Sequence, residues 1–543
     1  MSKYRSHNIA DLQISDDKEY LKICGRVERT RLHPNIIFFD LKDASGLVQC
    51  ALKKADDLNL FNEVFKNIKP HCMISADGAL IKRSPNFVNA KLLMGQVEFH
   101  VSKLRLLSKP TIYLDGADMQ EANRFKYRYL DLRSDESMNA IKLRSWLIHF
   151  VHRFFDRKNF TYVNTPLLAP STPEGARDFL VFSKNCSGRA YALPQSPQLF
   201  KQILMIAGIE NYYQLASCFR DEDLRANRQP EFTQLDLEMA WVDEMDVRNV
   251  LEEFLLELID EYQGEKLDKI GSISYADSLK FYGTDAPNTS IEGMYLKHDD
   301  EFTIICVDQP IEDRKEHYLK YLQDGKVFQV KDAKDGLESR LADASNVNID
   351  SYRFHSTDNS YIFYSASSKG MSELRDAVAK DFGLIKPGLH PIWVTDFPMF
   401  NLKEGKLEAC HHPFTCFEMT EEDPTSWKAV AYDIVINGQE VGGGSLRNTD
   451  PDLLERVFNL LGYSSDYVQE HFSFFLNALR VGVPPHGGLA LGFERLLSIM
   501  LGHESIRNVI AFPKSQAGTC FMTGAPTVPS LGQMAELGLK FID

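Results

Sequence analysis

The sequence lacks an apolar run of membrane-spanning length, a CxxC cysteine pair, and an apolar or arginine-rich segment near its first residues. The first absence excludes a membrane-spanning helix, which needs about 20 apolar residues in a row. The nine cysteines are scattered, so they predict reduced thiols rather than a disulfide framework or a zinc site. Because MSKYRSHNIADLQ resembles no secretion or organelle signal, we expect a cytoplasmic protein without membrane contact.

An excess of positive charge is also missing. The 543 residues carry a formal net charge of −15, which argues against a nucleic-acid partner, because phosphate contacts need lysine and arginine. The local cluster of Arg26, Arg29 and Arg31 nevertheless keeps such a partner open. Hydrophobic residues make up 44% of the chain and charged residues 25%, which is typical of a globular protein of roughly two to four domains.

Short β-rich runs dominate the beginning of the chain. They are YLKICGRV, NIIFFDLKD, GLVQCALKK and GQVEFHVSKL, and Gly, Pro and Asn separate them. They predict a small barrel within residues 1–108. An OB-fold, which binds oligonucleotides on one face, fits this spacing, and so does an unrelated small β-domain. After a polar linker over 109–140, apolar residues at helical spacing predict a long amphipathic helix that begins near Ser137.

The rest of the chain indicates one catalytic domain in two parts, 141–285 and 391–543. Strands and helices alternate through the first part, and motif-rich sequence resumes at HPIWVTDFPMF in the second. The polar stretch between them, 286–390, contains none of the candidate chemistry. An inserted α/β module explains this interruption better than two independent enzymes would.

Residues 219–241, FRDEDLRANRQPEFTQLDLEMAW, hold the densest set of polar side chains. In the second half Gln234, Asp236 and Glu238 alternate with Leu235 and Leu237, so the polar residues share one face of a strand. A half-exposed strand is the ordinary explanation of such alternation. The many charges of the adjoining turn instead favour a sheet floor that faces a ligand.

Two glycine clusters extend this candidate site. The glycines of GGLALGFERL permit close approach of the backbone, and Arg495 lies at the start of an apolar helix, where backbone N–H groups already attract anions. In EVGGGSLR, residues 440–447, Glu440 follows Asp433 by seven positions. Asp433 and Glu440 therefore offer two hard oxygen ligands suited to Mg²⁺ on phosphates.

Seven segments together resemble, in order, the motifs of class II aminoacyl-tRNA synthetases, and specifically bacterial-type aspartyl-tRNA synthetases of subclass IIb. They are TPEGARDFLV, ALPQSPQLFKQ, CFRDEDLRANRQPEFTQLDLEM, HHPFT, AYDIVINGQEVGGGSLR, PPHGGLALGFERL and SIRNVIAFPKSQ. The resemblance covers essentially the whole chain and is weakest over 286–390. It implies a multidomain α+β fold: an anticodon-binding OB barrel, a catalytic domain with an antiparallel sheet flanked by helices, and an inserted GAD-like domain.

The resemblance implies an activity as well. ATP, as a substrate, would activate L-aspartate with the help of Mg²⁺, and the aspartyl group would pass to the 3′-OH of tRNA(Asp). Asp433 and Glu440 would hold the metal, and Pro166 would lie in a homodimer interface. Catalysis would depend on Arg220, Glu440 and Arg495.

The substrate contacts implied by the resemblance form three sets. Aspartate would be bound by Glu174, Ser196, Gln198, Lys201, Arg220, Gln234, Asp236, His411 and Arg447. ATP would be bound by Arg220, Asp221, Glu222, Gln229, Phe232, Glu440, Gly492, Phe493, Glu494 and Arg495. The anticodon would be bound by Arg31, His33, Phe38 and Gln49.

Two cations favour aspartate over related amino acids. Lys201 and Arg447 can pair with a side-chain carboxylate, and arginine offers a bidentate fork for it. Asparagine would leave these cations poorly paired, at about 1–3 kcal/mol per unsatisfied group. Asp236 and Glu174 are expected to face the α-ammonium group. The rival hypotheses are a sister enzyme for asparagine or lysine, a non-catalytic RNA-binding paralogue, and an asparagine-forming ligase.

Some residues depart from the family pattern or need a choice. Glu494 stands where the family usually has Asp. His33 occupies a position associated with relaxed tRNA choice, which motivates the hypothesis that tRNA(Asn) is a second substrate. Phe38 should face outward to stack on a base, since the adjacent Phe39 points the other way. Of the pair that begins at His411, we expect the first near the substrate and the second in a structural role.

Overall fold

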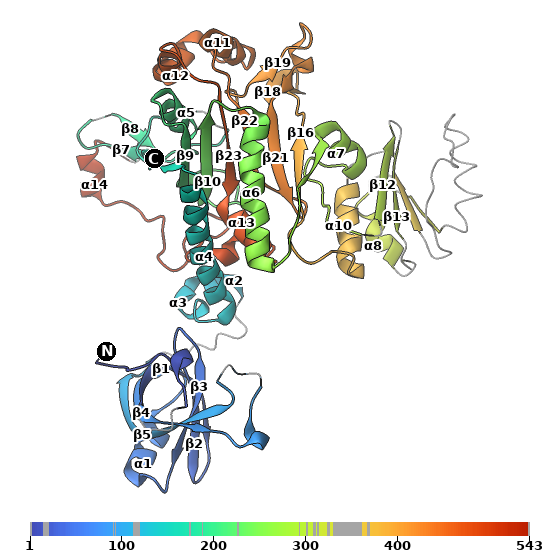
Figure 1. Ribbon diagram of the computed structural model, residues 1–543. Helices are drawn as coiled ribbons and strands as arrows, with labels where there is room; N and C mark the ends of the chain where they lie inside the picture. Colours follow the sequence, from blue (N-terminus) through green and yellow to red (C-terminus); the bar gives the residue numbers. More distant parts are fainter. Residues whose placement is uncertain are drawn as a thin grey trace. The chain divides into compact units, whose positions relative to one another are not determined.

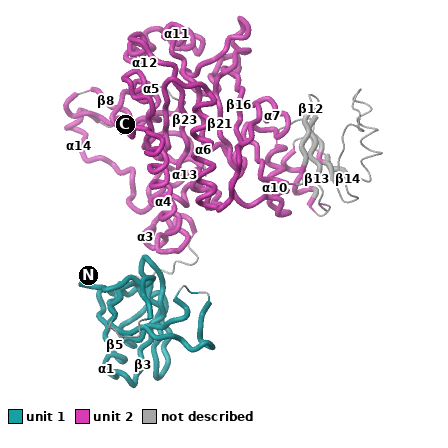
Figure 2. The backbone as a smooth tube through the Cα atoms, in the orientation of Figure 1, with its two compact units in different colours: residues 1–118 teal, residues 119–543 magenta. Residues whose placement is uncertain are grey.

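The computed structural model contains two compact units, residues 1–118 and 119–543 (Figure 2). It describes residues 3–14, 21–90, 92, 94–111, 120–172, 175–186, 188–224, 227–292, 294–299, 302–307, 311, 314–322, 326–329, 361–365 and 370–540. No helix within these ranges combines the length and the apolar character that a membrane crossing requires. No disulfide bond joins the cysteines whose side chains the structure describes.

The first unit is a closed β-barrel. Its strands are β1 (Leu21–Leu32), β2 (Ile36–Lys42), β3 (Leu47–Lys53), β4 (Met73–Lys82) and β5 (Val97–Ser108), and they pair in the order β1-β2-β3-β5-β4. Only β3 and β5 run parallel among these pairs. Helix α1 (Leu58–Asn67) connects β3 to β4 and begins at Asp57, whose side chain accepts a hydrogen bond from the Leu60 amide. This is the OB-fold, and the predicted barrel is confirmed.

Four of the barrel strands were predicted, and β4 was not. Asp77 and Gly78 interrupt the apolar pattern of β4, because the strand bulges between these two residues as it pairs with β5. The predicted opposite orientation of two neighbouring phenylalanines in β2 is confirmed. Phe39 is fully buried in the barrel core, whereas Phe38 is only partly covered.

The second unit is built on an eight-stranded sheet (Figure 1). Its order is β11-β16-β21-β22-β23-β10-β9-β6, antiparallel except for the two outermost pairs. The bounds are β6 (Thr161–Tyr162), β9 (Asn211–Phe219), β10 (Glu231–Ala240), β11 (Gly271–Ser274), β16 (Pro391–Thr395), β21 (Ala431–Ile436), β22 (Gln439–Leu446) and β23 (His486–Gly492). The predicted antiparallel sheet flanked by helices is confirmed. Three small ribbons lie beside it: β7 (Leu180–Phe182) with β8 (Ala190–Ala192), β17 (Phe400–Lys403) with β18 (Lys406–Ala409), and β19 (Phe417–Glu418) with β20 (Lys428–Ala429).

Helices α4 (Asp135–Arg157), α6 (Glu244–Gln263) and α13 (Phe493–Met500) share the main hydrophobic core with one face of the large sheet. Helix α4 is the predicted amphipathic helix, and the Ser134 side chain caps its first turn. Further helices of this unit, outside residues 286–390, are α2 (Glu121–Lys126), α3 (Arg128–Asp131), α5 (Gln198–Ile206), α7 (Tyr275–Tyr282), α11 (Pro451–Leu460), α12 (Ser465–Leu479) and α14 (Leu531–Glu536). Because helices cover one face of the sheet, polar strand residues must use the other face.

Residues 286–390 contain a separate small sheet. Its strands are β12 (Met294–Asp299), β13 (Phe302–Val307), β14 (Lys326–Gln329) and β15 (Tyr361–Ser365), in the order β12-β13-β15-β14. Helices α8 (Lys315–Leu319) and α10 (Met371–Phe382) accompany it, and they share a small core of their own with the sheet. The predicted domain boundaries remain predictions.

Candidate active site

The face of the large sheet opposite α4 and α6 bears a cavity of about 590 Å³. Strand β10 supplies part of its floor, since Gln234 and Asp236 line the cavity. Leu235 and Leu237 point the other way and are buried in the main core. The predicted alternation of polar and apolar faces along this strand is confirmed, and the polar face is the one that lines the cavity.

Most of the predicted substrate residues lie together around this cavity, although they come from distant parts of the chain. Those that line it are Ser196, Gln198, Lys201, Arg220, Glu222, Gln229, Phe232, Gln234, Asp236, His411, Asp433, Glu440, Arg447, Gly492, Glu494 and Arg495. Helices α5 and α13 and strands β10, β21, β22 and β23 carry ten of these sixteen residues, and the others lie in the segments between elements.

Two described residues of the predicted set, Asp221 and Phe493, do not line the cavity. Glu174 lies outside the described residues. The side chain of Phe493, predicted to contact ATP, is instead buried in the main core, because this apolar residue opens α13 on its inner face. Asp221, also predicted for ATP, lies 3.5 Å from Arg177 and lines a neighbouring cavity of about 550 Å³.

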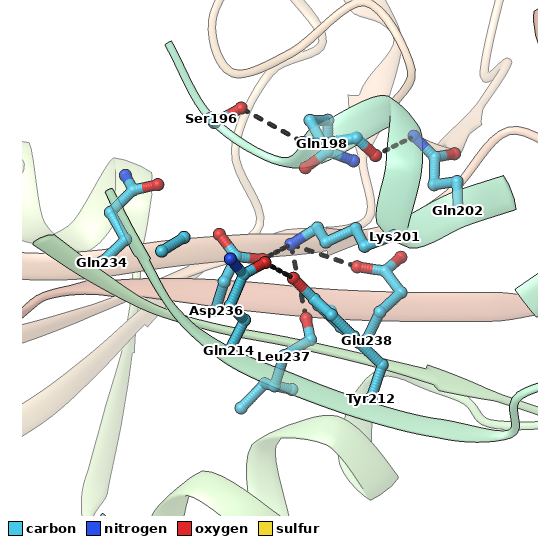
Figure 3. Close-up of polar contacts among 12 residues, drawn as sticks. Ser196, Gln198, Lys201, Gln202, Tyr212, Gln214, Gln234, Asp236, Leu237 and Glu238 are labelled. Atoms are coloured by element: carbon cyan, nitrogen blue, oxygen red, sulfur yellow. Dashed lines mark hydrogen bonds and ion pairs between the residues drawn. The ribbon is translucent and has the colours of Figure 1, made fainter. Parts of the chain in front are cut away.

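Four buried charged side chains form the charged cluster, which consists of Lys201, Asp236, Glu238 and Arg447 (Figure 3 shows the first three). The Lys201 ammonium group lies 2.5 Å from Asp236 Oδ1 and 3.2 Å from Glu238 Oε2. It also donates to the Leu237 carbonyl at 3.3 Å. Arg447 donates through Nε and Nη2 to the two oxygens of Glu238, at 2.8 and 3.0 Å.

Within the charged cluster, one edge of the Arg447 fork already has a partner. Glu238 occupies the edge formed by Nε and Nη2, because a buried cation needs a counter-charge whether or not a ligand is bound. Burial alone would raise the pKa of Glu238, but the charges of Arg447 and Lys201 outweigh it and lower the pKa to about 2. Glu238 was not among the predicted site residues, although its place in the alternation of β10 marks it.

Several polar atoms of the cavity are buried without any hydrogen-bond partner among the described residues. They are Gln198 Nε2, Arg220 Nε, Asp236 Oδ2, His411 Nε2 and His412 Nε2. Buried polar atoms are nearly always paired in folded proteins. A set of such atoms around one cavity therefore indicates a place for a polar ligand.

Two adjacent histidines contribute to the wall. His411 and His412 both line the cavity, although a structural role was predicted for the second. They lie outside any strand, so the expected alternation of a strand does not apply to them. Burial, followed by the charge of Arg447, lowers the pKa of His411 to about 4 and that of His412 to about 3. Both rings are therefore neutral at pH 7.

Another part of the cavity combines an aromatic ring with two arginines. The Arg220 guanidinium carbon lies 5.1 Å from the centre of the Phe232 ring, which is a cation–π distance. Arg495 lies 4.0 Å from Glu440 Oε1 and also donates to the Glu440 carbonyl. The Gln229 amide, predicted to touch a nucleotide, donates to the Lys514 carbonyl and accepts from the Lys514 amide. Gln229 therefore ties this wall to the C-terminal segment.

Acidic residues line the cavity near Arg495. Burial raises the pKa of Asp433 well above its usual value, and the negative charges of Glu440 and Asp285 raise it further. Gly443 leaves room for the Asp433 carboxylate, which a Cβ at that position would overlap. Across the described part of the chain no three His, Cys, Asp or Glu side chains converge as a metal site. The two predicted carboxylates thus suit a cation that takes its other ligands from phosphates and water.

In the first unit, the four residues predicted to contact an anticodon lie close to one another. Arg31 donates to Gln49 Oε1 at 3.1 Å and is the cross-strand partner of Phe38. The rings of His33 and Phe38 lie 6.0 Å apart in an edge-to-face arrangement. Arg31 is half-exposed, with 51% of its side chain accessible, so this face of the barrel combines a cation with an accessible aromatic ring.

Curated relatives named aspartate–tRNA(Asp/Asn) ligase are similar to the chain along its length. The relative from Thermoanaerobacter sp. (strain X514) is 36% identical, with 99% of this chain and 98% of the relative covered. The relative from Ruthia magnifica subsp. Calyptogena magnifica is 37% identical, and 99% of each sequence is covered.

Solved structures share the fold at lower identity. Asparaginyl-tRNA synthetase from Entamoeba histolytica, in complex with asparaginyl-adenylate, has a TM-score of 0.62 at 18% identity and covers 94% of this chain and 98% of that one. The enzyme of the same name from Pyrococcus horikoshii has a TM-score of 0.60 at 20% identity, over 92% and 95%.

Two family models match the chain. The OB-fold nucleic acid binding domain matches residues 21–107, which is the barrel of the first unit. The model for tRNA synthetases class II (D, K and N) matches residues 120–516, which include the large sheet and its cavity. With the full-length relatives, these matches show that the chain belongs to the class II tRNA synthetases (D, K and N).

Proposed function

We propose that the protein activates L-aspartate with ATP and transfers the aspartyl group to the 3′-OH of tRNA(Asp). The observation that carries the proposal is one cavity that joins buried cations, Lys201 and Arg447, to Arg220, Phe232 and Arg495. The first pair suits an acidic amino acid, and the other three suit a nucleotide. The names of the full-length relatives, aspartate–tRNA(Asp/Asn) ligase, support the same activity.

The charged cluster supports selection of an acidic substrate even though its charges are paired. Among the described residues, the hydrogen bonds of Arg447 to Glu238 and Ser445 use three of the five guanidinium N–H donors, which leaves two for a ligand. A carboxylate accepts from both of them. The amide of asparagine turns an N–H₂ group toward one, and that donor is then left unsatisfied, at about 1–3 kcal/mol. The unpaired Asp236 Oδ2 is placed to accept from an ammonium group of the substrate.

The nucleotide half supports in-line attack of the aspartate carboxylate on the α-phosphate, with pyrophosphate as the leaving group. Phe232 offers its ring to adenine, while Arg220 and Arg495 offset the repulsion between two anions and stabilise the charge of the transition state. The reaction needs no protein nucleophile. No general base has to remove a proton from the attacking group, because this group is already a carboxylate.

Asp433 and Glu440 fit Mg²⁺ as the cofactor of this step. Burial, followed by the negative charges of Glu440 and Asp285, raises the pKa of Asp433, and the carboxylate oxygens of Asp433 and Glu440 are hard ligands. When bound, Mg²⁺ neutralises phosphate charge. The two side chains would hold it beside Arg495, which itself contacts Glu440.

The OB barrel supports recognition of tRNA through its anticodon. Phe38 and Arg31 face the same side of β1 and β2, as base stacking and phosphate pairing require. His33 contacts Phe38 edge to face, so we retain the proposal that this residue relaxes tRNA choice and that tRNA(Asn) is a second substrate. The relatives' name, aspartate–tRNA(Asp/Asn) ligase, includes both tRNAs and supports that finer proposal.

Exposed apolar side chains around Pro166 support homodimer formation. Leu167 and Leu168, which follow Pro166, are 46% and 51% exposed. Leu180 and Phe182, in the nearby ribbon of β7 and β8, are also exposed. A group of exposed aliphatic and aromatic residues is typical of a surface that another chain covers.

Amino-acid-dependent exchange of pyrophosphate into ATP tests the proposal, with aspartate, asparagine and lysine supplied separately. We expect exchange with aspartate and at least about 100-fold less with either of the others. Exchange that depends on lysine or asparagine alone would contradict the assignment, and exchange with none of them would favour a non-catalytic relative. Charging assays with purified tRNA(Asp) and tRNA(Asn) then test the tRNA choice.

A further inference from the structure

A closed ring of hydrogen bonds lies behind the nucleotide half of the cavity and joins three elements. Arg144 of α4 donates through Nη1 to Glu494 Oε1 at 2.8 Å and through Nη2 to Thr233 Oγ1 at 2.9 Å. The Thr233 backbone amide donates to Glu494 Oε2 at 2.9 Å. The polar bridge formed by Arg144, Glu494 and Thr233 thus connects α4, β10 and α13, which Figure 1 shows close together.

The polar bridge occupies both oxygens of Glu494. This residue lines the cavity and its side chain is only 6% exposed, so little of the carboxylate is free for a ligand. The ladder between β10 and β23 ends at the pair Gln234 and Gly492. The next amide, that of Thr233, has no β23 partner, and Glu494 satisfies it instead. The carboxylate therefore continues the sheet by one hydrogen bond beyond its last strand pair.

Each end of the polar bridge adjoins a residue proposed to contact the nucleotide. Thr233 directly follows Phe232, whose ring is proposed to stack on adenine. Glu494 directly precedes Arg495, proposed to contact the phosphates. Arg144 also lies over the Phe493 ring at 5.0 Å, so it is held at the start of α13 from two sides.

We propose that Arg144 and Glu494 are positioning residues that set the separation between the adenine contact at Phe232 and the phosphate contact at Arg495. This inference rests on the proposed function, because it assumes that the nucleotide lies between those two residues. Neither member of the pair touches substrate. Their role is to keep a strand and a helix in register, since an error of about 1 Å in the placement of a binding group is enough to weaken a reaction severely.

The test compares Glu494→Gln and Arg144→Met with the wild-type protein. Glutamine still accepts from the Thr233 amide but presents an N–H₂ group to the guanidinium, so it breaks the link to Arg144 with little change in shape. In aspartate-dependent pyrophosphate exchange we expect the KM for ATP to rise about tenfold in each variant. The KM for aspartate should change less than about twofold, because the charged cluster shares no hydrogen bond with the polar bridge in the described structure.

The double variant and a control separate positioning from general destabilisation. If Arg144 and Glu494 act as one unit, the KM for ATP of the double variant should lie within about twofold of that of the more impaired single variant. Arg153→Met removes another ion pair of α4, that with Glu261 on the surface, and should leave both KM values unchanged. Calorimetric titration with ATP alone should show the same loss of about tenfold in affinity, even if no amino acid supports exchange.

Two results would overturn the inference. One is an unchanged ATP affinity in both single variants. The other is a parallel rise of the KM values for ATP and aspartate that follows the fall in melting temperature. Absence of exchange in the wild-type protein would instead contradict the proposed function, and the titration with ATP would still test the polar bridge.

Discussion

Individual residues of the cavity show how the protein keeps charges in a buried site. Lys201 and Arg447 have fractional exposures of 1% and 6%, and an isolated cation at such depth would be strongly destabilising. Asp236 and Glu238 supply equal and opposite charge, so the charged cluster is formally neutral before a substrate binds. A substrate carboxylate, in the proposed function, would then meet oriented N–H groups. The cluster holds no unpaired cation in the core before that carboxylate binds.

The pH dependence of folding should report the buried histidines. In an unfolded chain a histidine has a pKa of about 6.5, whereas burial and Arg447 lower that of His412 to about 3. Between these values the unfolded state binds a proton that the folded state does not. The contribution of His412 is therefore complete above pH 6.5 and is lost as the pH falls toward 3.

We expect His412→Asn to reduce this dependence. The free energy of unfolding, measured with urea at several pH values between 6.5 and 4, should fall less steeply in the variant, by up to about 1.4 kcal/mol per pH unit. The exposed His149 of α4 provides the control, and His149→Asn should retain the wild-type slope. Equal slopes for His412→Asn and the wild-type protein would show that the ring takes up protons in the folded state.

At the scale of elements, β23 approaches β10 closely, and a glycine of β23 leaves the room that the charged cluster needs. A Cβ on Gly488 would overlap both the Glu238 carboxylate and the Leu237 carbonyl. Gly488→Ala should therefore displace Glu238 from Arg447, lower the free energy of unfolding by about 1–3 kcal/mol and weaken aspartate binding. Thermal melting and the KM for aspartate measure the two effects.

Gly271 of β11 offers a matched control for this substitution. A Cβ there meets no other atom within 4 Å, so Gly271→Ala should leave melting and the KM for aspartate near their wild-type values. If both alanine variants behaved like the wild-type protein, the predicted overlap of a Cβ at position 488 with the Glu238 carboxylate would be contradicted.

Periodicity in the sequence predicts elements well where one face is apolar and fails where a local conflict hides it. Strands β1, β2, β3 and β5 and helix α4 all follow from their patterns, and so do the two faces of β10. Strand β4 was missed because Asp77 and Gly78 interrupt it. A bulge of this kind depends on the partner strand and leaves no periodic signal of its own.

The site was predictable in its membership but not in its pairing. The resemblance named half of the residues that line the cavity, gave the lining residue His412 a structural role, and left out Glu238, which pairs with Arg447. Which acid neutralises which cation depends on side chains from β10, β22 and α5 that meet only in three dimensions. No spacing along the chain records that arrangement.

For the whole molecule, separate hydrophobic cores in the two units imply that the proposed anticodon contacts can be removed without disturbing activation. Phe38→Ala should weaken tRNA charging by about 1–3 kcal/mol in kcat/KM, because one stacking surface is lost. Pyrophosphate exchange, which needs no tRNA, should remain unchanged. A fall in exchange of the same size would contradict this separation.

Its neighbour in β2 supplies the contrasting variant. Phe39 is fully buried in the barrel core, so Phe39→Ala should destabilise the first unit by about 3–5 kcal/mol. Limited proteolysis should then cleave within residues 21–107 first in this variant. The Phe38→Ala protein should resist digestion like the wild type.

Because the charged cluster has no net charge, it also restricts how this pocket can change during evolution. A single substitution of Lys201 or Asp236 leaves the other charge buried without its partner. The intermediate protein is therefore destabilised before it gains any new substrate preference. A lineage that shifts toward an uncharged amino acid must therefore exchange opposite charges together, or first acquire surplus stability elsewhere. Libraries that randomise one of these codons at a time will mostly return the starting residue, whereas libraries that randomise them in pairs sample the reachable alternatives.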